Sequence, residues 1–75
     1  MLSNERGKII ITLEEYRIAR GISKNQLASG ANIQRTQLLK YLRNDVSRVD
    51  LNVLARICTY LQCDLKDIMQ YKREN

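Results

Sequence analysis

The sequence contains no histidine, tryptophan, phenylalanine or proline. Histidine is the commonest general base and the commonest metal ligand, so its absence argues against most enzyme and metal sites. There is also no glycine-rich phosphate loop, no nucleophile paired with a base, no apolar run near the ~20 residues that cross a membrane, and no signal-peptide pattern. We therefore expect a cytoplasmic protein that is not an enzyme, uses no cofactor and does not enter a membrane.

Cysteine is scarce as well, with two residues, Cys58 and Cys63, on either side of a predicted helix end. Two thiols fall short of the four ligands of a structural zinc site, so we expect no metal. A disulfide between them is geometrically conceivable. The plainer interpretation is a pair of reduced thiols that serve as small core residues.

What the chain does have is a concentration of positive charge. Its 75 residues make one small domain with a formal net charge of +5. Residues 17–48 hold seven basic residues and one acid, a net charge of +6, whereas the remainder holds six basic and seven acidic residues, a net charge of −1. Such clustering is typical of a protein that binds a polyanion. A solvated charged surface is the alternative.

Three stretches predict helices outside this basic segment. Thr12 and Glu15 have the spacing of an N-terminal capping box, and Gly21 stands where that helix would end. Asp50 is placed to cap a second helix with an apolar stripe at Leu51, Leu54, Ala55, Cys58 and Leu61, which Ile57 broadens. Asp64 is placed to cap a further helix, the fifth and last, with an inner face at Leu65, Ile68 and Met69.

The ends of the chain predict a pair of strands. Ile9, Ile10 and Ile11 are consecutive β-branched residues, which favours a short strand. Residues 68–72 form the one comparable segment, so we expect the two to pair, within one chain or across a dimer. The alternative is an irregular N-terminal segment that packs on the helices. Residues 1–7 and 73–75 are expected to be tails outside a domain of residues 8–72.

The stretch from Ser23 to Leu42 predicts two short helices, at about 24–29 and 34–42, joined by a tight turn. Ser23 is a good N-cap, and Asn32 tolerates the left-handed backbone that ends a helix. Leu38, Leu42 and Tyr41 form the inner side of the second helix. Its outer side carries Arg35, Thr36, Leu39, Lys40 and Arg43. A helix of this kind suits insertion into a DNA major groove.

The pairs Leu27–Ala28 and Asn32–Ile33, followed by Leu38, stand at the spacings of the Cro/repressor-type (XRE-like) helix-turn-helix family, which this chain resembles. Asn32 occupies a position where that family usually has glycine. The resemblance implies an all-α, five-helix lambda-repressor-like fold that binds double-stranded DNA, here with a short strand pair added.

The resemblance also implies roles for individual residues. Arg35, Thr36 and Lys40 should face base edges, with Gln34 near them. Leu39 could meet a thymine methyl group, or pack against the flank of the bundle or a partner chain. The predicted phosphate-binding residues are Arg17, Lys24, Asn25, Arg43, Asn44, Ser47 and Arg48. Arg17 lacks the acidic partner that several family members place at the position of Leu42, so we expect it to be free for phosphate or merely solvated.

The function implied is a sequence-specific transcriptional regulator, most simply a repressor, that binds a palindromic operator as a homodimer. The alternative is an antitoxin or adaptor that uses the same fold to bind a protein partner. Tyr60 and Tyr71 are candidates for a dimer surface, and equally for exposed tyrosines without a partner.

Overall fold

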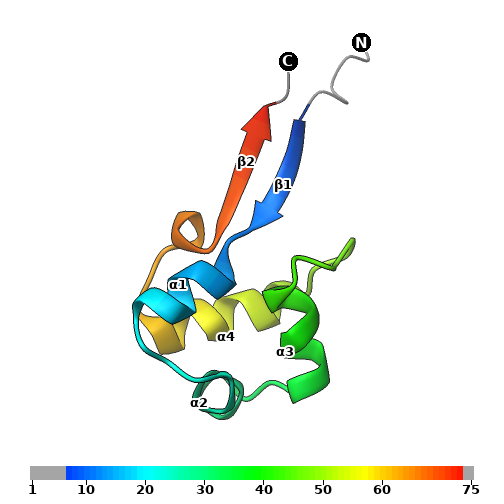
Figure 1. Cartoon of the computed structure of the whole chain (residues 1–75). Helices are drawn as coiled ribbons and strands as arrows, with labels where there is room; N and C mark the ends of the chain where they lie inside the picture. Colours follow the sequence, from blue (N-terminus) through cyan, green and yellow to red (C-terminus); the bar gives the residue numbers. More distant parts are fainter. Residues whose placement is uncertain (1–6, 74–75) are drawn as a thin grey trace.

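The computed structural model describes residues 7–73. In chain order these form strand β1 (Gly7–Ile11), helices α1 (Leu13–Ala19), α2 (Lys24–Gly30), α3 (Arg35–Leu42) and α4 (Leu51–Leu61), the 3-10 turn η2 (Leu65–Asp67) and strand β2 (Met69–Arg73). The four α-helices pack into one bundle, and the two strands project from it as a ribbon (Figure 1). None of the helices within residues 7–73 is long and apolar enough to cross a membrane.

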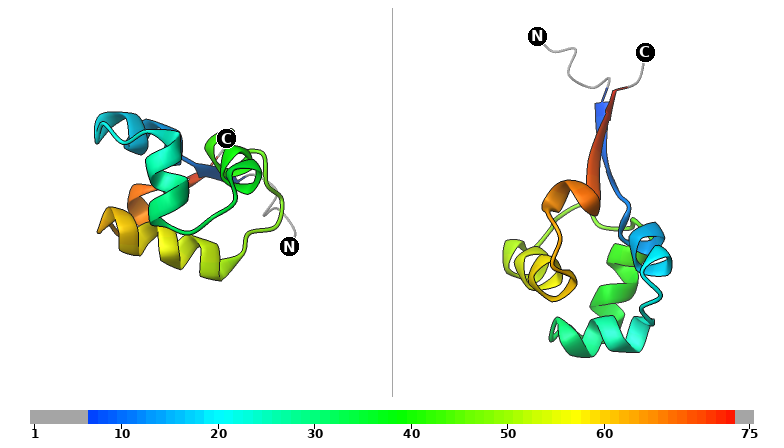
Figure 2. Two further views of the ribbon diagram at one scale, coloured as in Figure 1. Left: turned by 90° about the horizontal axis from the view of Figure 1, so that it is seen from below. Right: turned by 90° about the vertical axis from the view of Figure 1, so that its left-hand side faces the viewer.

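The predicted pairing of the two ends is confirmed, and it occurs within one chain. Strands β1 and β2 are antiparallel, with Ile9 opposite Tyr71 and Ile11 opposite Met69. The ribbon points away from α2 and α3 in both side views (Figures 1 and 2). The strands begin at Gly7 and end at Arg73, so each extends one residue into a segment expected to be a tail. The remaining tail residues, 1–6 and 74–75, lie outside the described residues.

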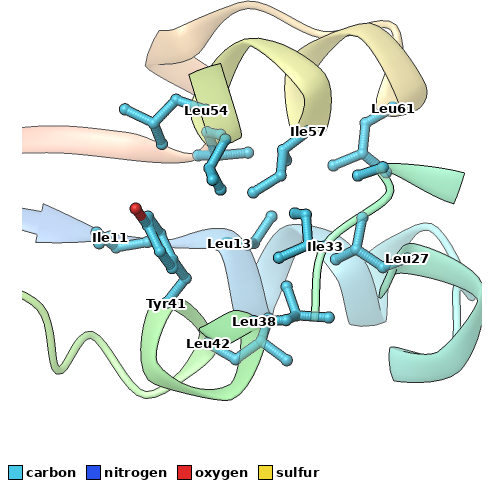
Figure 3. Close-up of a cluster of buried hydrophobic side chains, with 13 residues drawn as sticks. Ile11, Leu13, Leu27, Ile33, Leu38, Tyr41, Leu42, Leu54, Ile57 and Leu61 are labelled. Carbon is cyan, nitrogen blue, oxygen red and sulfur yellow. The ribbon is translucent and has the colours of Figure 1, made fainter. Parts of the chain in front are cut away.

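The core is built largely from aliphatic side chains that converge from the four α-helices, the base of the ribbon and the segments between them. Leu13, Leu27, Leu38 and Ile57 are fully buried, and Ile11 brings the base of β1 into the same cluster (Figure 3). Tyr41 and Leu42 are buried with Leu38, as the pattern of α3 predicted. Burial of this apolar face leaves the opposite side of α3 toward solvent.

The apolar stripe predicted for α4 is wrong in part. Leu51 is 76% exposed and Ala55 is also exposed, whereas Val53, which was not predicted, joins Leu54, Ile57 and Leu61 in the core. The helix carries apolar residues around most of its circumference, so two overlapping stripes fit the 3.6-residue period. Contacts with the other helices, which the sequence pattern does not contain, select the stripe centred on Ile57.

The predicted fifth α-helix is also wrong, because the chain makes only the single turn η2 before it enters β2. The Asp67 carboxylate accepts a hydrogen bond from the Asp64 N–H at 2.9 Å, so the predicted start of a helix is present. The Ile68 carbonyl then accepts a hydrogen bond from the Thr12 N–H at 2.8 Å, and Met69 pairs with Ile11. The residues that would have extended the helix therefore form β2 and pair with β1 instead.

The capping box predicted at Thr12 does not form. The Thr12 side chain makes no cap hydrogen bond in α1, and its hydroxyl donates instead to the Asp67 carbonyl at 3.4 Å. Thr12 follows β1 directly, so its backbone conformation is set by the sheet and η2. At α4, by contrast, the Asp50 carboxylate accepts from the Asn52 N–H at 2.8 Å, as predicted.

The helix ends follow the sequence closely. Gly21 and Asn32 both adopt the left-handed backbone, with φ of 68° and 56°. In each case the next residue closes the helix, because Ile22 N–H reaches the Arg17 carbonyl at 3.1 Å and Ile33 N–H reaches the Ala28 carbonyl at 2.9 Å. These two turns set the angles at which α1 leads into α2 and α2 into α3.

Cys58 and Cys63 are free, half-buried thiols that pack against the core. Burial and the neighbouring Cys58 raise the pKa of the Cys63 thiol to about 11. Both observations agree with the interpretation of reduced cysteines used as small core residues.

Candidate nucleic-acid interface

Helix α2 is fixed at its start by a reciprocal pair of hydrogen bonds. The Ser23 hydroxyl accepts from the Gln26 N–H at 3.0 Å, and the Gln26 side-chain oxygen accepts from the Ser23 N–H at 2.8 Å. Ser23 was predicted as the cap, but the part played by Gln26 was not. The turn that follows α2 is held from the far side, because Arg56 of α4 donates to the Ala31 carbonyl at 3.0 Å. The relative placement of α2 and α3 is therefore determined at both ends of α2.

The outer side of α3 is open to solvent. Gln34, Arg35, Thr36 and Lys40 are all exposed, while Leu38 on the opposite side is fully buried. Lys40 and Thr36 lie one helical turn apart, so they project from the same face. Four of the residues predicted to read bases thus share an accessible surface, and their contact with DNA stays a prediction.

Arg35 is joined to α2 across the helix-turn-helix. Its guanidinium Nη1 donates to the Asn25 side-chain oxygen. Asn25 was predicted to bind phosphate from the first turn of α2; its oxygen accepts this bond from Arg35, and its contact with phosphate stays a prediction. The remaining N–H groups of the guanidinium can still make the two parallel bonds that arginine forms with guanine.

Leu39, the fifth predicted base-reading residue, is half-buried and packs against the core. Of its two interpretations, the structure favours packing over contact with a thymine methyl group. A leucine at this position covers the flank of α3 without closing the polar face beside it.

Beside this face lies a hollow of about 430 Å³ between α3 and the loop that leads to α4. Its walls are formed by Thr36, Gln37, Lys40, Tyr41, Asp45, Val46, Ser47, Arg48 and Asp50. The Tyr41 hydroxyl accepts from the Asp50 N–H at 2.9 Å and so anchors the end of the loop to α3. Gln37 and Asp45 belong to this wall but were not among the predicted contacts. The i, i+3 spacing of Gln37 and Lys40 was the available signal.

The expectation that Arg17 is free or merely solvated is wrong. Its guanidinium makes two hydrogen bonds of 2.9 Å to the two carboxylate oxygens of Glu14, and a third of 2.8 Å to the Ile22 carbonyl. This pairing lowers the pKa of the Glu14 carboxyl. The acidic partner lies one turn earlier on α1, whereas the family pattern places such a partner on α3, at the position of Leu42. These three hydrogen bonds within the chain argue against a phosphate contact for Arg17.

Arg20 also turns away from the candidate face. Its guanidinium contacts the Tyr16 hydroxyl at 2.6 Å and the Leu61 carbonyl at 3.3 Å. The net charge of residues 17–48 is therefore larger than the positive charge that the candidate face can present to DNA, because Arg17 and Arg20 are engaged within the chain. Among the described residues, Arg35 and Lys40 lie on α3, Arg43 and Arg48 follow it, and Lys24 lies at the start of α2.

The predicted phosphate contacts surround α3 unevenly. Arg43, Ser47 and Arg48 are exposed at its C-terminal side, and Lys24 is half-buried at the start of α2. Asn44 is exposed, but its side-chain oxygen accepts the Ile11 N–H at 2.8 Å. Within residues 7–73, a polyanion would thus meet positive charge on both sides of the polar face.

A short helix with a buried apolar back and a polar, cationic front, preceded by a second helix and a tight turn, defines a helix-turn-helix domain of the class that binds DNA. The family model for the Cro/C1-type HTH DNA-binding domain matches residues 12–74, and the chain belongs to this family.

Among solved structures, this chain is similar to the transcriptional regulator VanUg in crystal form II. The two share 28% sequence identity with a TM-score of 0.74, over 99% of this chain and 97% of that one. A comparison with curated proteins gives no match.

Proposed function

We propose that this protein is a sequence-specific transcriptional regulator that reads the DNA major groove with α3. The observation that carries the proposal is the division of α3 into a fully buried side, centred on Leu38, and an exposed side with Arg35, Thr36 and Lys40. Likeness to a solved transcriptional regulator over nearly the whole of both chains supports the regulatory role.

The exposed side chains suit base recognition in different ways. Arg35 can bond guanine O6 and N7 together, and Thr36 offers both a hydroxyl and a methyl group. Gln34 and Lys40 add hydrogen-bonding reach at the two ends of the same face. Arg43, Ser47 and Arg48 are placed to contact backbone phosphates, which positions the protein without specifying sequence.

We further propose that the regulator is a repressor and a homodimer. A protein that occupies a promoter excludes competing proteins from it. Repression therefore requires no surface other than the one that binds DNA. One α3 reads only a few base pairs, and a second copy would double the site. Two copies related by a two-fold axis would bind half-sites about 34–36 Å apart.

Selection of bound sequences from a random DNA pool tests this function. We expect enrichment of a palindromic consensus with half-sites about one helical turn apart. The variant Arg35→Ala should lose the preference at one position in each half-site, while Lys66→Ala, on η2, should enrich the same consensus as the wild type. Failure of the wild type to enrich any sequence above the input pool would reject sequence-specific binding.

A further inference from the structure

The apolar face of the β-ribbon continues beyond the core that covers its base. Side chains alternate between the two faces of a strand, so Ile9 and Ile11 share one face with their partners Tyr71 and Met69. Ile11 is buried and Met69 half-buried, but Ile9 is 58% exposed and Tyr71 is 61% exposed. The same apolar surface therefore begins in the core and ends in solvent.

The apolar face of the ribbon also has a defined shape, with a tyrosine ring packed at its tip and a groove at its base. Tyr71 lies over the backbone of Gly7, where an added Cβ would fall 2.0 Å from the tyrosine oxygen. At the base of the ribbon, a groove of about 230 Å³ runs toward the loop after α3. Its lining residues are Ile9, Ile11, Asn44, Val46, Ser47, Val49 and Met69. Val49, itself 42% exposed, extends the apolar surface from the ribbon onto that loop.

The distribution of charge indicates what this surface can accept. No charged residue lines the groove, although the chain carries a net charge of +5. Lys8 and Lys72 form a cross-strand pair on the opposite face of the ribbon. Two copies that meet through the apolar face would therefore keep these cations apart. Arg73, opposite Gly7, is the charged strand residue on the apolar face, and it lies at the tip of the ribbon, outside the groove. An acidic partner would therefore find no cation within the groove itself.

The position of the groove also fits a second copy. Val46 and Ser47 line both the apolar groove and the hollow beside α3. A copy seated in the groove would thus adjoin the candidate nucleic-acid interface, and Arg35, Thr36 and Lys40 are not among the residues that line the groove. Other exposed apolar side chains, such as Ile18 and Leu65, stand on separate elements and do not extend this surface.

We propose that the apolar ribbon face, formed by Ile9, Tyr71, Met69 and Val49, is the surface through which two copies of this chain pair in solution. The proposal deepens the proposed function, because it names the dimer surface that a two-fold operator needs, but the pairing itself does not depend on DNA. A two-stranded ribbon is marginal alone, and a partner that covers its apolar face supplies the missing layer.

Sedimentation velocity of the full chain over a wide concentration range tests the surface. The wild type should dimerise, and Ile9→Glu should weaken dimerisation by about 30-fold or more, as expected when a charge enters the centre of an interface. Val49→Glu should act in the same direction without altering a strand. Ile18→Glu is the matched control, because Ile18 is a 61% exposed isoleucine on α1, and it should dimerise like the wild type.

Circular dichroism and thermal unfolding of each variant separate loss of pairing from loss of folding. Binding to a duplex with a single half-site separates the surface from the proposed function, because a monomeric, folded Ile9→Glu, which places its charge on the ribbon and not beside Arg48, should bind it with wild-type affinity. Absence of DNA binding by a wild type that dimerises through this face would reject the function and leave the surface standing.

Three results would overturn the surface. They are a monomeric wild type, a dimer unaffected by both Ile9→Glu and Val49→Glu, and equal loss of dimer in Ile18→Glu. Dimerisation that appears only after removal of residues 1–6 would assign the groove to the chain's own N-terminal segment.

Discussion

The Ile11 N–H donates a hydrogen bond of 2.8 Å to the side-chain oxygen of Asn44, 33 residues later in the chain. Asn44 is also the left-handed residue that ends α3, with φ of 59°. Its neighbour Asp45 closes the helix by donating to the Lys40 carbonyl at 2.9 Å. One side chain thus ties the base of the β-ribbon to the C-terminal end of the helix proposed to read DNA.

The two roles of Asn44 can be separated by substitution. Asn44→Gly keeps the left-handed backbone but leaves the Ile11 N–H without its acceptor, and should lower the free energy of unfolding by about 1 kcal/mol. Asn44→Ala loses the acceptor and also strains the backbone, and should lower it by about 2–3 kcal/mol. Urea unfolding measures both values.

Asn32→Gly is the matched control for this pair. Asn32 has the same left-handed role at the end of α2, and its side chain makes no such bond within residues 7–73, so glycine should cost nothing there. An Asn44→Gly variant as stable as the wild type would show that the bond to Ile11 contributes nothing.

Stability should depend on pH through the Glu14–Arg17 pair. The pKa of Glu14 is lowered from its ordinary value of 4.5, chiefly by the hydrogen bond from Arg17. A carboxyl with a lowered folded-state pKa contributes stability above its ordinary value and loses it as the pH falls through the folded value. Thermal midpoints of the wild type and Glu14→Gln should therefore differ above about pH 5 and converge below pH 4.5.

Glu15→Gln provides the comparison for that titration. Glu15 is exposed on the same helix, so its variant should follow the wild type across the range. A gap between wild type and Glu14→Gln that stays constant down to the acid limit would contradict the pairing as the cause.

DNA affinity should fall steeply with salt, because each phosphate neutralised by the protein releases a condensed counterion. Arg48→Ala should weaken binding to all sequences alike and reduce the slope of log affinity against log salt by about one. Lys66→Ala, on η2, should leave the slope unchanged. Fluorescence anisotropy with a labelled duplex measures these slopes, and a flat response of the wild type would exclude phosphate contact as a major source of affinity.

Much of the fold follows from local signals in the sequence. Ser23, Gly21, Asn32 and Asp50 end or begin helices as predicted, because caps depend on a few adjacent residues. The apolar side of α3 was predictable for a similar reason, since Leu38 and Leu42 allow one helical face. The strand pair was predictable because three isoleucines in succession needed a partner.

The errors arise where distant segments decide the outcome. Thr12 carries the sequence of a helix cap, but its position between β1 and η2 directs its hydroxyl to Asp67. Residues after Ile68 could continue a helix, and pairing with β1 turns them into a strand. In α4, tertiary packing selects Val53 over Leu51.

At the candidate interface the helix and its exposed face were predictable, whereas the hydrogen-bond partners were not. The bonds of Arg35 to Asn25 and of Arg56 to Ala31 join residues from different elements. Arg17 shows the opposite problem. Its partner Glu14 is only three residues away, but the family resemblance pointed to the position of Leu42 for an acidic partner. Position along a helix predicts exposure better than it predicts a polar partner.

The most direct test of the proposed role of α3 compares the affinity of Arg35→Ala with that of the wild type on the preferred duplex and on a scrambled duplex. We expect a loss of about 1–3 kcal/mol on the preferred site, a much smaller loss on the scrambled one, and relaxed preference at a single base pair. Equal losses on the two duplexes would place Arg35 on the DNA backbone and contradict base reading by this helix.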